Sequence, residues 1–287
     1  MASMRDIRHR RSSIQSTQQI TKAMKLVSTV KLQRARADAE KTKTYFDCMY
    51  ETVGNILKRV GAISHKYLKA GESPNKAVIV ITSNRGLAGG YNSNIVKLVT
   101  REEAFHKEEL KIYAIGGKGR DALERAGYEI TEDLSDISEN PSYEDAMALS
   151  ARLLDSFAAG EIGEIYLAYT SFKNTVSHDP VLLKLLPVEY QETEEKEDMG
   201  RALMNFEPED ETALDMIIPK YITSLIYGGL KEAIASENGA RMQAMDNATE
   251  NAEEMGSVPS LQPCKTKLHY PGADRDHRRS GGHLIIL

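Results

Sequence analysis

Two glycine-rich segments come nearest, in residue type and spacing, to ligand-binding chemistry. GLAGGY (86–91) follows the apolar run KAVIVIT (76–82), and IGGKGRD (115–121) follows the run ELKIYAIG (109–116). A glycine loop between a strand and a helix can bind a phosphate through its backbone N–H groups. Neither segment has the G-x-G-x-x-G spacing or the Lys and Ser/Thr of a P-loop. We therefore interpret both as tight turns, with a nucleotide site as the alternative.

The remaining reactive residue types form no legible catalytic or metal-binding pattern. The acids between 192 and 198 have the spacing of a surface loop, and no Ser/His/Asp or Cys/His arrangement is present. Cys48 and Cys264 are far apart without CxxC spacing, so we expect no disulfide framework and a buried Cys48. We predict no catalytic residues, no cofactor and no metal. A zinc site is conceivable by residue type alone at Cys264, His269, His277 and His283, with a spacing that matches no standard site.

A long amphipathic helix is predicted for residues 1–61. The stretch 7–40 contains no Pro or Gly, and its small and apolar residues recur at heptad spacing. A second helix is predicted for 207–255, with a similar narrow row. Each row contains too few large apolar residues for either helix to be stable by itself, so we expect the helices to pair as a long antiparallel coiled coil. The predicted seam consists of Ile7, Ile14, Thr21, Ser28, Tyr221, Gly228, Ala235, Met242 and Thr249.

Between the helices the hydrophobic pattern changes to that of an α/β domain. Short β-branched runs alternate with helical segments over residues 74–190, which predicts an open Rossmann-like layer with four strands. Residues 191–206 read as an acidic surface loop. The fold class is therefore α/β, a two-helix coiled coil with an inserted α/β domain.

Composition and charge restrict the class further. The chain has 41% hydrophobic residues and no Trp, and it contains no apolar run long enough to span a membrane. The N-terminus lacks the apolar segment of a secretory signal, so a cytoplasmic protein is expected. Residues 1–43 carry 11 Lys or Arg against 3 Asp or Glu, whereas 189–211 carry 10 acids against 2 bases. The basic end lacks interleaved aromatics, which disfavours nucleic-acid binding.

Three long motifs, in this order, resemble signatures of the gamma subunit of bacterial F-type ATP synthases. They are DIRHRRSSIQSTQQITKAMKLVSTVKLQRA, TSNRGLAGGYNSN and LIYGGLKEAIASENGARMQAMDNATENAEEM, and the resemblance covers residues 1–255. It implies a rotor whose coiled coil is the central shaft inside a ring of alpha and beta subunits. The α/β foot would sit on the epsilon subunit and the membrane c-ring, as one copy per complex on the cytoplasmic face of the membrane.

The resemblance and the charge pattern together suggest contact residues. Basic side chains of the first helix can attract acidic loops of the stator, and Met24 and Lys25 match the segment where the family's shaft passes the beta subunits. Phe206 and Glu207 match the foot segment that meets the c-ring. The predicted stator contacts are Arg8, Lys22, Met24, Lys25 and Lys31.

A rotor of this kind would be a non-catalytic subunit that transmits torque between a proton-driven c-ring and the nucleotide sites of the beta subunits. Two other classes stay open on the residues alone. One is a small-molecule or nucleotide-binding α/β enzyme with a coiled-coil arm, and the other is a free-standing coiled-coil adaptor.

The C-terminal tail, 256–287, departs from the family. Pro259, Pro263 and Pro271 exclude the continuous helix that the family has here. Codons can be chosen so that the adjacent reading frame resembles the family's C-terminal helix, which suggests a single-nucleotide frameshift; a genuine disordered extension is the alternative. In an antiparallel pair, residues 7 to about 24 would then face sequence downstream of Met255, and we expect the first turns of the helix to be frayed.

Overall fold

The computed structural model describes residues 4–60, 65–175, 177–188 and 210–257. The predicted acidic loop 191–206, the foot residues Phe206 and Glu207, and the tail from residue 258 lie outside these ranges. The elements in chain order are α1 (Met4–Val60), β1 (Lys76–Ile81), α2 (Tyr91–Arg101), η1 (Lys107–Glu109), β2 (Leu110–Ile115), α3 (Gly117–Arg125), β3 (Ile130–Asp133), η2 (Ser135–Ser138), α4 (Tyr143–Ala158), β4 (Glu164–Phe172), β5 (His178–Leu186) and α5 (Asp210–Ser257).

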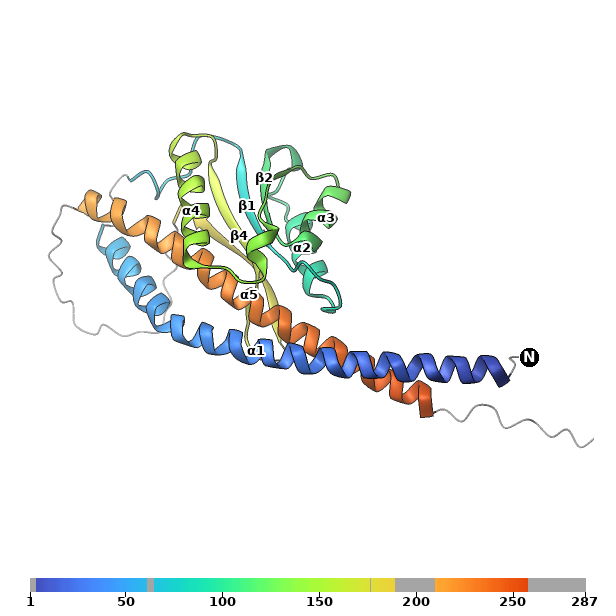
Figure 1. The fold of residues 1–287 in the computed structure, drawn as a ribbon. Helices are drawn as coiled ribbons and strands as arrows, with labels where there is room; N and C mark the ends of the chain where they lie inside the picture. Colours follow the sequence, from blue (N-terminus) through green and yellow to red (C-terminus); the bar gives the residue numbers. More distant parts are fainter. Residues whose placement is uncertain (1–3, 61–64, 176, 189–209, 258–287) are drawn as a thin grey trace, which may run out of the picture.

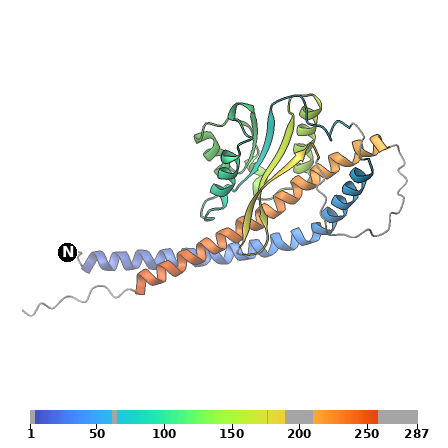
Figure 2. The same ribbon diagram turned by 180° about the vertical axis from the view of Figure 1, so that it is seen from behind.

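The molecule is a mixed α/β structure with a central sheet and long N- and C-terminal helices. Figures 1 and 2 show α1 and α5 lying side by side and extending together well beyond the sheet domain. The described part of α1 has 57 residues and that of α5 has 48. At about 1.5 Å per residue, α1 follows a path of roughly 85 Å.

The sheet has five strands in the order β3-β2-β1-β4-β5. β1 pairs in parallel with both β2 and β4, and β2 pairs in parallel with β3. β5 is antiparallel to β4, since the two form a hairpin without a crossover helix. The strand order reverses between β1 and β4, so this is the topological switch point of the sheet. The turn after β1 lies at the carboxyl edge of the sheet at this point.

The prediction of four strands was wrong, because β3 was missed. Its sequence, ITED, is short and acidic, and its side chains alternate between half-buried and exposed. An edge strand needs only one neighbour and little apolar surface, so it lacks the apolar run that marked the other strands.

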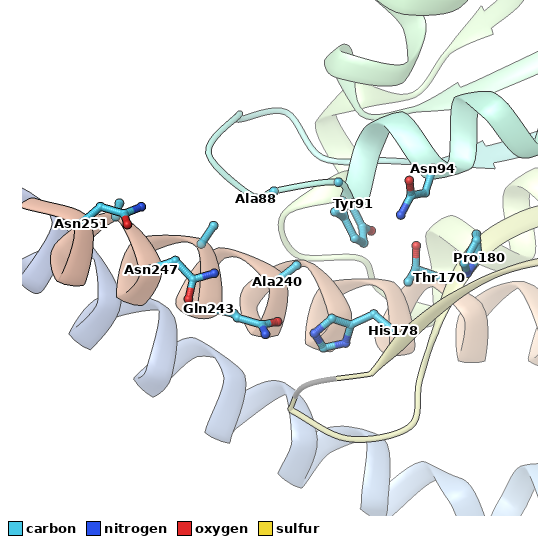
Figure 3. A pocket seen from close by; sticks show the side chains of 14 residues that line it. Ala88, Tyr91, Asn94, Thr170, His178, Pro180, Ala240, Gln243, Asn247 and Asn251 are labelled. Atoms are coloured by element: carbon cyan, nitrogen blue, oxygen red, sulfur yellow. The ribbon is translucent and has the colours of Figure 1, made fainter.

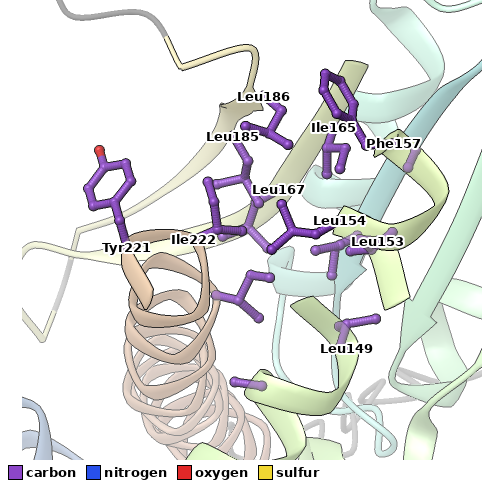
Figure 4. Close-up of a cluster of buried hydrophobic side chains, with 14 of the residues drawn as sticks. Leu149, Leu153, Leu154, Phe157, Ile165, Leu167, Leu185, Leu186, Tyr221 and Ile222 are labelled. Carbon is purple, nitrogen blue, oxygen red and sulfur yellow. The ribbon is translucent and has the colours of Figure 1, made fainter. Parts of the chain in front are cut away.

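Apolar side chains fill both faces of the sheet. Ala77, Ile79 and Ile81 of β1 face one cluster, whereas Val78 and Val80 face the other, because successive strand residues point to opposite sides. α4 and the first half of α5 cover the first face (Figure 4), and α2 and α3 cover the second.

α5 is continuous but changes partner along its length. Its first half buries Leu214, Ile218, Ile222, Ile226 and Leu230 against the sheet, with side chains four residues apart on one face. Its second half packs on α1. Pro219 lies inside this helix, where it lacks an N–H for the helical ladder, and the helix nevertheless continues.

The expectation of a buried Cys48 was wrong, since this cysteine is exposed on α1. α1 packs mainly against α5 and leaves its other faces open, so a small residue in its sequence is no sign of burial.

Candidate functional site

The shaft, defined here as α1 residues 18–35 packed against α5 residues 235–253, has a seam of small and hydroxyl-bearing side chains. The Thr21 and Thr249 hydroxyl oxygens lie 2.7 Å apart, and both residues are buried. Ser28 is buried in the same row, and Leu32 and Ala35 pack against Ala235. The close approach of the helices follows from these small side chains.

The other predicted seam residues lie in varied surroundings. Ile14 is half-buried, and the side chain of Ile7 lies outside the described part of the chain. Met242 packs partly against the Leu32 cluster. Tyr221 belongs to the cluster beneath the sheet, and Gly228 is half-buried. Next to it Gly229 faces the sheet, because a Cβ there would lie 2.9 Å from Leu167.

The register of the shaft corrects one expectation. Gln18 donates to Glu253, and Lys25 Nζ lies 2.5 Å from Asp246. Residues 18–25 therefore face α5 upstream of Met255, rather than the tail. With Thr21 opposite Thr249, position 15 lies opposite Met255, so among the described residues of α1 only those before about position 15 extend past Met255.

The predicted stator-contact cations fall into two groups. Lys22 and Lys25 form ion pairs with Glu253 and Asp246 across the shaft, and hydrogen bonds from Lys22 and Gln18 hold the pKa of Glu253 below its usual value. Arg8 and Lys31 are exposed, and Met24 is half-buried. The sequence indicated a basic surface, but the pairing depends on the register of two distant segments.

An apolar stripe on the outer face of α1 was missed. Ile20, Leu26, Val27 and Val30 are 48–68% exposed although they lie in the middle of a long helix. Exposed apolar residues gathered on one face indicate an interaction surface. The signal was present in the sequence, because these residues fall outside the predicted seam and yet are large and aliphatic.

A largely buried ion pair within α5 is linked to the turn after β1 through its arginine. Arg241 Nη1 lies 2.7 Å from Glu237, and the two side chains are 12% and 17% exposed. The Arg241 guanidinium also donates to the carbonyl oxygens of Arg85 and Gly86 at 3.3–3.4 Å. Burial raises the pKa of Glu237, and Arg241 opposes that rise. The next turn residue, Leu87, is 62% exposed and has a left-handed backbone, φ +63°.

Further contacts fasten α5 to the same edge of the sheet domain. The Glu232 carboxylate accepts from the Ser171 hydroxyl at 2.9 Å and from the N–H of Phe172. Ser236 donates to the carbonyl of Thr170 at 3.0 Å, and the Tyr91 hydroxyl donates to Ala233 at 3.2 Å. The shaft helix and the sheet domain are thus joined by directional bonds as well as by apolar packing.

A groove of about 380 Å³ opens between the GLAGGY turn, the β4–β5 hairpin and α5 (Figure 3). None of the described residues that line it is a Lys, Arg, Asp or Glu. Thr170 Oγ1 and both ring nitrogens of His178 are buried and have no hydrogen-bond partner of normal geometry among the described residues. Amide side chains form the rim, namely Asn94, Gln243, Asn247 and Asn251.

The second glycine-rich turn has no comparable space. A Cβ on Gly116, whose φ is +107°, would lie 2.2 Å from the Thr82 carbonyl oxygen, and one on Gly119 would lie 2.5 Å from the Thr82 hydroxyl. Glycine is required at both positions so that α3 can start directly against the end of β1.

Within the described ranges, no group of three or more His, Cys, Asp or Glu side chains is arranged to hold a metal ion. Among the same residues, no helix combines the length and the apolar content that crossing a membrane requires.

Comparison with known proteins gives a consistent assignment. The family model described as ATP synthase matches residues 3–266, which extends beyond Met255, where the recognisable motifs end. The chain is 62% identical to the ATP synthase gamma chain of Lachnoclostridium phytofermentans, over 91% of this chain and 92% of that protein. It is 38% identical to the sodium ion specific ATP synthase gamma chain of Acetobacterium woodii, over 90% and 91%.

Among solved structures, the chain is similar to a chain of the central stalk and c-ring of the Tetrahymena thermophila mitochondrial ATP synthase. The TM-score is 0.57 at 25% sequence identity, and the match covers 80% of this chain and 99% of that chain.

Proposed function

Because the chain belongs to the ATP synthase gamma chain family, we propose that it is the rotor of the central stalk, transmitting torque between a c-ring in the membrane and nucleotide sites on the surrounding beta subunits. The chain itself is non-catalytic in this role. We take the coupling ion to be the proton, with sodium as the alternative that the Acetobacterium relative represents.

The observation that carries the proposal is that one helix serves both the sheet domain and the shaft. α5 buries its first half under the sheet and its second half against α1. A force on the far end of the shaft therefore reaches the sheet domain through helical backbone, with Glu232, Ser236 and Arg241 as cross-links at the junction.

The shaft surface supports rotation rather than fixed attachment. A rotor must contact its surroundings at many angles without binding strongly at one. The outer face of the shaft combines the exposed aliphatic stripe of α1 with separate cations. Exposed charges give long-range attraction with little desolvation.

The partners in the proposed arrangement are the alpha and beta subunits around the shaft and the epsilon subunit and c-ring at the sheet domain. The proposed stator contacts are Arg8, Lys22, Met24, Lys25 and Lys31, and the proposed c-ring contacts are Phe206 and Glu207. The complex would hold one copy of the chain, peripheral on the cytoplasmic face of the membrane. The two long helices would act as a coiled coil, and the strand order supports a Rossmann-like foot.

Co-expression with the alpha, beta, epsilon and c subunits of a close relative tests the proposal. We expect a complex that contains one copy of this chain and hydrolyses ATP. A chain that never co-purifies with alpha and beta would contradict the rotor assignment. An enzymatic activity of the free chain would instead favour the α/β-enzyme alternative.

A further inference from the structure

The groove of Figure 3 lies where open α/β sheets bind ligands. It sits at the carboxyl ends of β1 and β4, between which the strand order reverses, and the first strand-to-helix turn forms one wall. In this fold class the crevice at that point is the general location of small-molecule sites. The opposite wall is α5, which lies across the crevice.

The groove contains buried hydrogen-bonding groups that have no partner of normal hydrogen-bond geometry among the described residues. Thr170 is 3% exposed, and its hydroxyl points toward Tyr91 and Asn94 across the groove (Figure 3). The His178 ring projects from β5 over α5, and its two nitrogens also lack partners of normal geometry. Buried polar groups in native proteins are nearly always paired, with protein, water or ligand.

The lining selects against charged ligands. Among the described lining residues there is no cationic side chain to neutralise a phosphate or carboxylate and no anionic side chain to hold an amine. Burial lowers the pKa of His178, so its ring is neutral near pH 7. The groups that face the groove are instead amides, a hydroxyl and an imidazole, which together offer both donors and acceptors.

The shape favours a flat molecule. The α5 wall presents Ala240, Ala244 and Ala248 at four-residue spacing, and the turn opposite contributes Ala88 and Gly89. These small side chains leave a smooth surface on each side. Asn and Gln side chains on the rim can form paired hydrogen bonds with the edge of a planar heterocycle, as they do with adenine.

We propose that this groove is a binding site for an uncharged, planar, hydrogen-bonding molecule of nucleoside size, held by Thr170, His178 and the rim amides. The site is independent of the rotor function, because it rests on the geometry of the single chain. A free nucleoside and a nucleotide present the same base and sugar and differ in the charged phosphate. The uncharged lining of the groove favours the nucleoside.

Titration of the purified full-length chain with adenosine, followed by chemical-shift changes of the His178 ring protons, tests the proposal. We expect a dissociation constant on the order of 0.1 mM, as befits a ligand of this size. Thr170→Val keeps the shape but removes the hydroxyl, and should weaken binding about fivefold. Ala248→Leu fills the groove and should abolish binding.

Glu250→Leu is the matched control, because it adds the same side chain to an exposed position of α5 outside the groove. It should leave adenosine binding unchanged. Circular dichroism of each variant checks that the fold persists.

The outcomes separate the alternatives. Absence of adenosine binding up to about 10 mM, a hundredfold above the expected constant, would overturn the proposal and leave the groove to water. Binding that survives Ala248→Leu would place the site elsewhere. ADP binding more than tenfold tighter than adenosine would show an anion site and contradict the uncharged ligand. These results do not depend on assembly with alpha and beta, so they are distinct from a failure of the rotor proposal.

Discussion

The hydroxyl oxygens of Thr21 and Thr249, from opposite ends of the chain, lie 2.7 Å apart in the buried seam of the shaft. Thr249 also donates to the carbonyl of Met245 at 2.7 Å, so the pair extends into the helical backbone. The contact is specific to one register of α1 and α5, because sliding one helix along the other would separate the two hydroxyls.

Replacing one member of this pair should cost more than replacing both. Thr249→Val leaves the Thr21 hydroxyl without its cross-helix partner, so we expect a loss of about 1–2 kcal/mol in the free energy of unfolding. The double variant Thr21→Val/Thr249→Val restores a matched apolar contact and should lose less than the sum of the singles. Urea unfolding of the four proteins gives the coupling energy, and additive losses would show that the hydroxyls do not interact.

Removing Arg241 should loosen the turn after β1. Arg241→Ala leaves Glu237 buried without its cation and removes the donors to Arg85 and Gly86, so we expect a loss of about 2–4 kcal/mol in the free energy of unfolding. Amide hydrogen exchange of residues 86–90 should accelerate.

Two variants separate the charge of this pair from its geometry. Arg241→Lys retains the charge but not the forked donor, and should recover only part of the protection of the turn. Arg241→Met/Glu237→Met removes both charges and should be more stable than Arg241→Ala. Unchanged exchange in Arg241→Ala would mean that the turn is held by its own contacts.

The stability of the protein should fall on mild acidification through His178. Burial lowers the pKa of this histidine in the folded state, while Asp179 and the backbone of Thr175 oppose the shift. The unfolded chain therefore binds the proton more tightly, and stability is lost as the pH falls through about 6.5 toward the lower folded-state pKa. His178→Phe cannot titrate, so its melting temperature should fall less than that of the wild type between pH 7 and 5. Parallel curves would contradict this.

Gly239→Ala should change the stability of the protein in opposite directions in the wild type and in a His178→Ala background. A Cβ on Gly239 would lie 2.7 Å from Cε1 of the His178 ring, so Gly239→Ala should destabilise the protein by about 1–2 kcal/mol despite the higher helix propensity of Ala. In a His178→Ala background the ring is absent, and the same Gly239→Ala change should stabilise by up to about 1 kcal/mol. Thermal unfolding of the set measures both values, and destabilisation in both backgrounds would indicate another cause.

The exposed stripe of α1 should matter to the assembly and not to the free chain. Leu26→Gln/Val27→Gln removes two exposed aliphatic side chains, so the stability of the isolated chain should change by less than about 0.5 kcal/mol. The yield of complex with alpha and beta should decrease. Gln19→Ala/Gln33→Ala, at exposed polar positions of the same helix, is the control. Equal yields from both variants would exclude the stripe as a contact.

Heptad spacing was sufficient to predict the buried positions of four residues, because residues at this spacing share one helix face, and that face becomes the contact surface of a helix pair. The four residues are Thr21, Ser28, Ala235 and Thr249. It could not supply the register between two segments more than 200 residues apart. The expectation that residues up to about Met24 face the tail was therefore wrong, and the pairing of Lys22 and Lys25 with α5 acids was missed.

The groove shows a second kind of limit. Its walls come from the turn at 88–91, the β4–β5 hairpin and α5, and no local pattern relates these segments. The glycines of GLAGGY suggested a turn or a phosphate loop, but the small side chains of α5 that complete the groove lie outside the predicted helix seam. Only the crossing of α5 over the sheet edge brings them together.

The passage of α5 from beneath the sheet into the shaft has a mechanical consequence. The helix has no loop at the junction, so the described chain contains no swivel between Leu230 under the sheet and Ala235 in the shaft. Any elastic strain stored when the two ends are loaded in opposite senses must be spread along the helices as twist. The molecule is thus a torsion bar with its compliance distributed over its length rather than concentrated in a joint.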